Sequence, residues 1–129
     1  MELRYTILYV EKVKKSLEFY RDAFGFEIQF LHESEDYGEL NTGNTKLAFS
    51  SVSLMNNLGK SPAAPNPNAP VFEIAFETDD VQAAYQRAIQ AGATSVQEVR
   101  DEAWGQTTSY VHDFNGYLIE ICSPVKNQT

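Results

Sequence analysis

A pattern that occurs twice constrains the fold of this chain more than any other feature. Residues 3–10 are rich in β-branched and aromatic residues, as strands are. The apolar residues that follow have the spacing of one helix face: Val13, Leu17, Tyr20 and Phe24. Residues 71–77 again have the composition of a strand, and the next positions repeat the helical spacing: Val81, Tyr85, Ala88 and Gly92. We therefore expect two similar halves.

Three further strand candidates follow each expected helix. They are residues 26–34, 37–42 and 45–53 in the first half and residues 94–99, 106–114 and 117–123 in the second. Asn115 and Gly116 form a dipeptide typical of a tight, two-residue hairpin turn. Segment 56–70 holds four of the five prolines and few residues to bury, so we expect a poorly ordered linker or loop. The pattern predicts one α+β domain over residues 1–129, with modules at about 1–55 and 71–125.

Charge and cysteine content narrow the classes of function. The 129-residue chain has a net charge of −8, which repels nucleic acid phosphates and suits a cationic ligand. Its single cysteine, Cys122, excludes an intrachain disulfide and a zinc site made of cysteines. The start lacks the pattern of a secretory signal, and no apolar run is long enough to span a bilayer. We therefore expect a cytoplasmic protein that binds neither nucleic acid nor membranes.

Alternation along the strands predicts which side chains point away from the helices. Aligning the two halves gives four corresponding positions on that face: Tyr5, Ala48, Glu73 and Glu120. A buried carboxylate needs a partner, a proton or a metal ion, and Glu120 lies between Ile119 and Ile121. We therefore expect Glu73 and Glu120 to line a cavity. The alternative is that both carboxylates lie on a strand surface that faces solvent.

Three stretches carry a resemblance to a known family. They are ILYVEKVKKSLEFYRDAFGF, FEIAFETDDVQAAYQRAIQAGA and WGQTTSYVHDFNGYLIEI, in this order along the chain. Together they resemble the vicinal oxygen chelate superfamily, which includes glyoxalases, extradiol dioxygenases, and bleomycin- and fosfomycin-resistance proteins. The resemblance implies two βαβββ modules whose sheets form a half-open barrel around a pocket. It also implies a homodimer, since many members of the superfamily are homodimers.

The same resemblance assigns the metal ligands of metal-dependent members to four positions of this chain. These positions are Tyr5, Ala48, Glu73 and Glu120. Glyoxalases commonly have His or Gln at the first and third of these positions and Glu at the second and fourth. Only Glu120 matches this pattern, and Ala48 has no donor atom for a metal ion. His32 lies outside these positions, and a two-residue turn would pair Val111 with Glu120 and so point His112 to the opposite face. We expect no complete metal site and no cofactor, with a bound divalent metal ion as the alternative.

Without a metal ion, the precedent in the superfamily is binding, because bleomycin-resistance members sequester a cationic drug in acidic clefts lined by aromatic side chains. We therefore expect a small-molecule-binding protein whose ligand has a cationic group. The expected ligand-binding residues are Tyr5, Ala48, Glu73, Trp104 and Glu120. Family members often have a tryptophan at the pocket mouth where this chain has Trp104, and packing in a dimer interface is its alternative role. Tyr110 is a further aromatic candidate, although alternation favours the helix side beside Ile121 for it.

The alternative function is a metal-dependent lyase or isomerase of the glyoxalase type. Glu73 or Glu120 would be its general base, because an apolar pocket raises the pKa of a carboxylic acid toward the range that suits proton abstraction next to a carbonyl. The missing donor at Ala48 weakens this alternative, since glyoxalase-type isomerisation also uses the metal ion to stabilise the enediolate. A third class is an interaction module with a filled pocket. The sequence does not identify the ligand.

Overall fold

The first half of the chain folds as one helix laid against a four-stranded sheet. In chain order its elements are β1 (Tyr5–Val10), α1 (Val13–Phe24), β2 (Ile28–Leu31), β3 (Tyr37–Leu40), β4 (Lys46–Ser51) and the short α2 (Val52–Asn57). Helix α1 ends at Gly25, whose φ of 80° is left-handed and lets its N–H bond to the carbonyl of Arg21. The spacing of apolar residues therefore predicted both the helix and its end.

The second half repeats this order of elements. It contains β5 (Glu73–Glu77), α3 (Val81–Gln90), β6 (Thr94–Asp101), β7 (Thr107–His112) and β8 (Leu118–Cys122). Asp80 caps α3, because its carboxylate accepts the backbone N–H of Ala83 at 3.1 Å. Both modules are therefore of the βαβββ type, as the duplicated pattern predicts.

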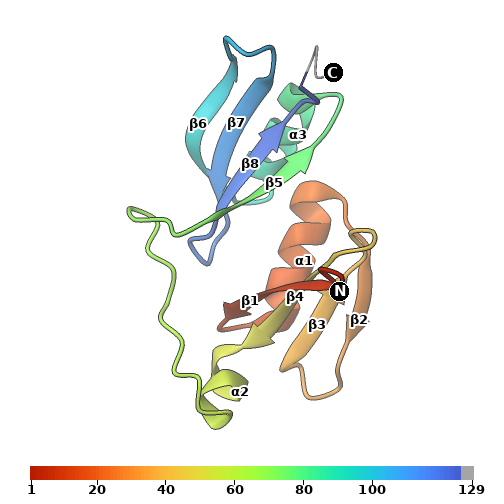
Figure 1. The fold of residues 1–129 in the computed structure, drawn as a ribbon, viewed down its shortest axis with the longest axis vertical. Helices are drawn as coiled ribbons and strands as arrows, with labels where there is room; N and C mark the ends of the chain where they lie inside the picture. The colour runs from red at the N-terminus through yellow and green to blue at the C-terminus, as the bar shows by residue number, and fades with distance from the viewer. Residues whose placement is uncertain (126–129) are drawn as a thin grey trace. The chain divides into compact units, whose positions relative to one another are not determined.

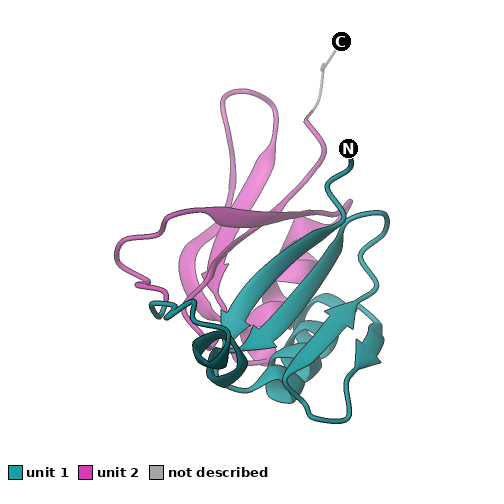
Figure 2. Cartoon of the chain, turned by 60° about the horizontal axis from the view of Figure 1, so that its bottom comes forward, with its two compact units in different colours: residues 1–64 teal, residues 65–129 magenta. Residues whose placement is uncertain are grey.

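The structure is a computed structural model that describes residues 1–125. The chain divides into two compact units, Met1–Ala64 and Pro65–Thr129, which Figure 2 shows in different colours. The first residues of the expected linker 56–70 belong to α2, which ends at Asn57. This helix follows β4 directly, and Ser51 caps it by accepting the N–H of Leu54. The mobility of this segment stays a prediction. Within the described part of the chain, no helix is both long enough and apolar enough to cross a membrane.

Each sheet has the same topology and a helix on one face (Figure 1). The strand orders are β1-β4-β3-β2 and β5-β8-β7-β6, with the first two strands of each order parallel. Ala48 pairs with Ile7 in the first sheet, and Glu120 pairs with Ala75 in the second. Both sheets are thus aligned by the same register, so Ala48 corresponds to Glu120 and Tyr5 to Glu73.

The apolar core of the first unit lies between α1 and its sheet. Leu17 and Tyr20 of α1 are fully buried, as are Leu40 and Phe49 of the sheet. The rings of Tyr20 and Phe49 pack with their centroids 5.1 Å apart. In the second unit, Val111, Ile119 and Ile121 form the corresponding buried face. We call the face of each sheet opposite its helix the open face. The candidate site residues lie on this face.

The hairpin between β7 and β8 corrects the predicted register. Asp113 and Tyr117 close it with a hydrogen bond, so the loop has three residues rather than two. The Asp113 carboxylate accepts the N–H groups of residues 115–117, and Gly116 has a φ of 102°. Tyr110, not Val111, therefore pairs with Glu120. The prediction that Tyr110 and His112 point away from the face of Glu120 was wrong, because one extra loop residue reverses the face.

Candidate functional site

The open face of the second sheet brings polar and ionisable side chains together. Strand register aligns Ala75, Glu120 and Tyr110 in one row across β5, β8 and β7. Cys122 and Thr108 pair in the neighbouring row. Because residues two apart on a strand share a face, Glu73 lies on this face as well. The sequence-predicted carboxylates Glu73 and Glu120 are therefore on one face of one sheet.

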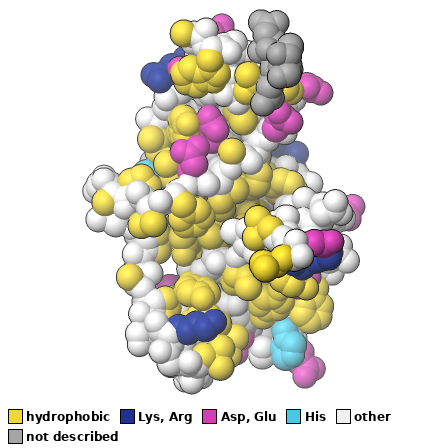
Figure 3. All heavy atoms as spheres, viewed as in Figure 1, with side chains coloured by type: hydrophobic (Ala, Val, Ile, Leu, Met, Phe, Trp, Pro, Cys, Tyr) yellow, Lys and Arg dark blue, Asp and Glu magenta, His cyan; other side chains and the backbone are white. Residues whose placement is uncertain are grey.

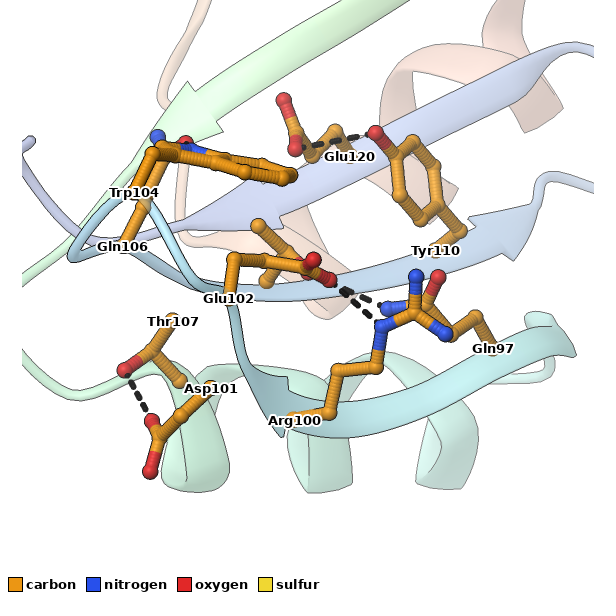
Figure 4. Close-up of polar contacts among 10 residues, drawn as sticks. Gln97, Arg100, Asp101, Glu102, Trp104, Gln106, Thr107, Tyr110 and Glu120 are labelled. Atoms are coloured by element: carbon orange, nitrogen blue, oxygen red, sulfur yellow. Dashed lines mark hydrogen bonds and ion pairs between the residues drawn. The ribbon is translucent and has the colours of Figure 1, made fainter.

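Tyr110 and Glu120 form the central hydrogen bond of this face. The Tyr110 hydroxyl donates to Oε2 of Glu120 at 3.0 Å (Figure 4). Burial raises the pKa of Tyr110 well above its ordinary value, and the bond to Glu120 raises it further. The phenol consequently keeps its proton at neutral pH and acts as the donor. This arrangement fixes the direction of the Glu120 carboxylate.

Glu73 is influenced by the same pair. Burial raises the pKa of Glu73, and the nearby charge of Glu120 raises it further, while contact with the Tyr110 hydroxyl acts in the opposite direction. The residue as a whole is exposed, so solvent screens part of this effect. Two carboxylates that repel each other across an open sheet face have a common way to relieve the repulsion, which is to bind a cation.

We expect Glu120→Gln to lower the pKa of Glu73 toward, but not fully to, its ordinary value. The substitution removes the charge of Glu120, whereas the burial of Glu73 stays. NMR titration of the side-chain carboxyl carbons measures this directly. As the raised pKa means that the folded state favours protonated Glu73, Glu73→Gln should also stabilise the protein at neutral pH. This gain should shrink as the pH falls through the raised pKa of the folded state and be absent below the unfolded value of about 4.5. An unchanged Glu73 titration in Glu120→Gln would contradict the proximity of the two carboxylates.

A second network runs along β6 and the following loop (Figure 4). Gln97 donates to Thr108 at 3.1 Å, and Thr108 donates to Glu102 at 3.0 Å. Arg100 also bonds to Glu102 and lowers the pKa of that carboxyl. Strand β6 shifts register between Gln97 and Arg100, so Gln97 pairs with Tyr110 and Arg100 with Thr108. Sequence analysis missed these residues, because simple alternation does not reveal a β-bulge.

Trp104 lies at one end of this face, in the loop between β6 and β7. Its indole N–H donates to Gln106 at 2.8 Å, and the Gln106 amide in turn donates to the carbonyl of Ser123 at 3.0 Å. The residue is 58% exposed. In Figure 4 its ring extends toward the side of the sheet that carries Glu120. Trp104 is therefore a large aromatic surface held beside the carboxylates and accessible to a ligand.

Cys122 is buried on the same face, beside Glu120. Burial raises the pKa of its thiol, and the charges of Glu120 and Glu77 raise it further. A thiol in this state is neutral at physiological pH, so it is a poor nucleophile and a poor metal ligand. Its contribution to the face is a small side chain in contact with the Glu120 carboxylate.

The predicted residues of the first module lie on the open face of the first sheet, but they differ in accessibility. Tyr5 is 47% exposed, whereas Ala48 is fully buried. Ala48 lies between its register partners Ile7 and Glu39. Contact of a ligand with Ala48 therefore requires that neighbouring side chains move, whereas Tyr5 is accessible as it stands. The role of both residues in ligand binding stays a prediction.

The donor set does not fit the metal site that the superfamily resemblance implies. Ala48 presents only a methyl group, and one oxygen of Glu120 already accepts the Tyr110 proton. His112 shares the face of Glu120, in contrast to the prediction, and pairs with Leu118. His32 bonds instead to Ser34 in the turn after β2. Among residues 1–125, no three His, Cys, Asp or Glu side chains are grouped closely enough to hold a metal ion.

Comparisons with known proteins identify the family of this fold. The family model of the glyoxalase/bleomycin resistance protein/dioxygenase superfamily matches residues 2–121. A solved structure of a family enzyme from Burkholderia phytofirmans superposes with a TM-score of 0.81 at 20% identity, covering 95% of this chain and 98% of that one. This similarity confirms the fold alone. The chain belongs to the glyoxalase/bleomycin resistance protein/dioxygenase superfamily.

Two relatives align over almost their whole length. The uncharacterized protein YraH of Bacillus subtilis is 28% identical over 124 residues, which cover 94% of this chain and 97% of the relative. An ethylmalonyl-CoA/methylmalonyl-CoA epimerase of Cereibacter sphaeroides is 29% identical over 132 residues, covering 92% and 95%. The chain is therefore similar both to a protein without an assigned activity and to an enzyme.

Proposed function

We propose that this protein binds a small organic molecule with a cationic group, and that it does so without a metal ion at the ligand positions of the superfamily. The observation that carries the proposal is the arrangement of Glu73, Tyr110 and Glu120 on one open sheet face. Tyr110 orients Glu120 at 3.0 Å, and the two carboxylates repel each other. A cation that binds between them gains charge pairing with both, and Trp104 offers an aromatic face beside them.

The surface composition supports the same proposal. Acidic side chains lie among hydrophobic ones on the face of the molecule in Figure 3. Small-molecule sites typically combine apolar walls with a few placed polar groups. Trp104 is an exposed aromatic candidate for such a wall beside these carboxylates, and a role of Tyr5 in ligand binding stays a proposal for the first unit. Homodimerisation and a cytoplasmic location, both implied at the sequence level, stay part of this proposal.

The proposal is tested by metal content and ligand binding together. We expect protein purified without a histidine tag to contain far less than one zinc, nickel or iron ion per chain by plasma mass spectrometry. We also expect metal-free bleomycin, as a cationic glycopeptide probe, to bind in isothermal titration calorimetry and to raise the unfolding temperature. About one metal ion per chain that is lost in Glu120→Ala would overturn the metal-free part of the proposal. Absence of binding by a panel of cationic probes would overturn the cation part.

A second candidate function is proton transfer at a carbon next to a carbonyl. It is favoured by the raised pKa of Glu73, which suits a general base, and by the relative named an epimerase. The poor fit of the donor set to a metal ion counts against it, because the metal ion supplies the stabilisation of the enediolate in glyoxalase-type reactions. Turnover of a 2-oxoaldehyde–thiol adduct that Glu73→Gln abolishes would favour this candidate over binding alone.

A further inference from the structure

The dipeptide Asn115-Gly116 carries a chemistry that the candidate ligand site does not use. Among the 129 residues, no other asparagine precedes a glycine. This sequence favours deamidation, because glycine has no side chain to hinder its backbone nitrogen. The Gly116 nitrogen loses its proton and attacks Cγ of Asn115, and the side-chain amide leaves as ammonia. Water then opens the succinimide ring to aspartate or isoaspartate, which adds one negative charge.

In the folded chain, Asp113 holds the nitrogen that would make this attack. The Gly116 nitrogen lies 2.9 Å from Oδ1 of Asp113 and 3.1 Å from the Asp113 carbonyl oxygen, and it donates to both. The same Oδ1 accepts the N–H of Asn115 at 3.0 Å and that of Tyr117 at 2.9 Å. Asp113 is only 3% exposed. One buried carboxylate therefore holds three consecutive backbone amides at the tip of the hairpin.

These contacts oppose the first step of deamidation in two ways. The Gly116 nitrogen has to turn away from Asp113 and toward the side chain of Asn115, which breaks both of its hydrogen bonds. It also has to lose its proton, and an amide anion next to a carboxylate is disfavoured because like charges repel. The reaction therefore requires that the tip of the hairpin first opens.

Two prolines of the same unit limit the movement of this tip. A Cβ atom added to Gly116 would lie 3.5 Å from Cδ of Pro67 and 3.6 Å from Cγ of Pro65, so both rings lie against the glycine. The ring of a proline fixes its φ angle, which leaves the backbone at these two positions little freedom to move away. The peptide between Asn115 and Gly116 is thus held by the carboxylate of Asp113 and contacted by two stiff residues.

We propose that Asn115 is a site of spontaneous deamidation and that Asp113 sets its rate, by keeping the Gly116 nitrogen unreactive while the hairpin is closed. In the isoaspartate product the main chain runs through the former side chain, which lengthens the loop by one carbon atom. Loop length fixes the register of β7 against β8, so this product should disturb the pairing of Tyr110 with Glu120. The proposal does not depend on the identity of any ligand.

The test compares the rate of deamidation of Asn115 in the folded protein and in the protein unfolded by urea. Peptide mass spectrometry measures the product, and labelling by an isoaspartyl methyltransferase identifies isoaspartate. We expect the folded protein to react at least about tenfold more slowly, the worth of a hydrogen bond to a charged group. Equal rates in the folded and the unfolded protein would overturn the proposal.

Variants of Asp113 separate its role from the general effect of folding. Asp113→Ala should raise the rate in the folded protein by about 10- to 100-fold, because it removes a charged acceptor. Asp113→Asn keeps a neutral acceptor of the same shape and should raise the rate by about two- to tenfold. Circular dichroism checks that each variant folds, and Asp113→Asn carries the test if Asp113→Ala does not. The control Glu98→Gln removes an exposed carboxylate of β6 and should leave the rate within about twofold of the original.

Hydrogen exchange of the Gly116 amide distinguishes the proposed contact from other effects of the substitution. Exchange and deamidation require the same opening of the tip, so Asp113→Asn should accelerate both by a similar factor. A rate of deamidation in Asp113→Asn that equals the original rate would overturn the proposal. A lower rate would overturn it as well, because the carboxylate would then act as a general base that removes the proton of Gly116.

Discussion

Glu120→Gln should weaken the binding of bleomycin, used as the cationic probe, by about 10- to 100-fold, the usual worth of a hydrogen bond to a charged group. Glutamine keeps the shape of the side chain and still accepts the Tyr110 proton through its amide oxygen. The variant therefore removes the charge while preserving the local structure. Isothermal titration calorimetry measures the affinity, and Trp104 adds an optical measurement, because it is the only tryptophan of the chain and lies beside the site.

Glu98→Gln is the matched control for this experiment. Glu98 is an exposed carboxylate in β6 of the same unit, so its substitution changes the net charge by the same amount. We expect its affinity for the probe to stay within about twofold of the original, because an exposed surface charge contributes little. An equal loss of affinity in both variants would mean that the overall negative charge of the protein, and not the Glu120 carboxylate, attracts the ligand.

Phe49→Ala should lower the free energy of unfolding by about 3–5 kcal/mol, the usual cost of removing a buried aromatic ring. Phe49 is fully buried on the helix side of β4 and packs against Tyr20. Its removal leaves a cavity that the rigid sheet and helix cannot fill completely. Urea denaturation followed by circular dichroism measures the change, and a loss below about 1 kcal/mol would show that the first unit does not depend on this packing.

Phe30→Ala gives the informative comparison. Phe30 belongs to the same sheet, but its ring lies on the open face and is 46% exposed. Its removal should cost less than about 1 kcal/mol, as is usual for an exposed side chain. The pair of variants thus compares the same residue type on the two faces of one sheet. A large loss in Phe30→Ala would indicate that its ring contributes to stability despite its exposure on the open face.

The sequence predicted most of the fold because the helix side of each module obeys simple periodicity. The spacing of Val13, Leu17, Tyr20 and Phe24 marks α1, and the alternation in residues 71–77 marks β5. The two halves could also be aligned correctly, since both parallel strand pairs use the same register. Periodic burial is a local property, so it can be read from the sequence.

The open faces were harder to predict, because they depend on single-residue irregularities. The side chain of Asp113 caps the β7–β8 hairpin and extends its loop to three residues, which turned Tyr110 toward Glu120. The bulges near Phe30 and between Gln97 and Arg100 likewise break the alternation. Such irregularities are set by pairing with neighbouring strands, which a single strand's sequence does not contain. The carboxylates were therefore predicted, but not all of their partners.

The two sheets obtain similar chemistry in different ways. In the second sheet, Tyr110 and Glu120 meet across two strands, whereas in the first sheet Tyr37 and Glu39 are neighbours on one strand. Glu39 and Tyr110 occupy corresponding positions, because they pair with Ala48 and Glu120, but the hydrogen-bond partner of each lies at a position that has no counterpart in the other pair. The duplicated architecture has therefore kept its packing face while its opposite face diverged. Substitutions on the open face of such a fold can therefore create a binding site for a new ligand, while the packed core on the helix side, which stabilises the fold, stays unchanged.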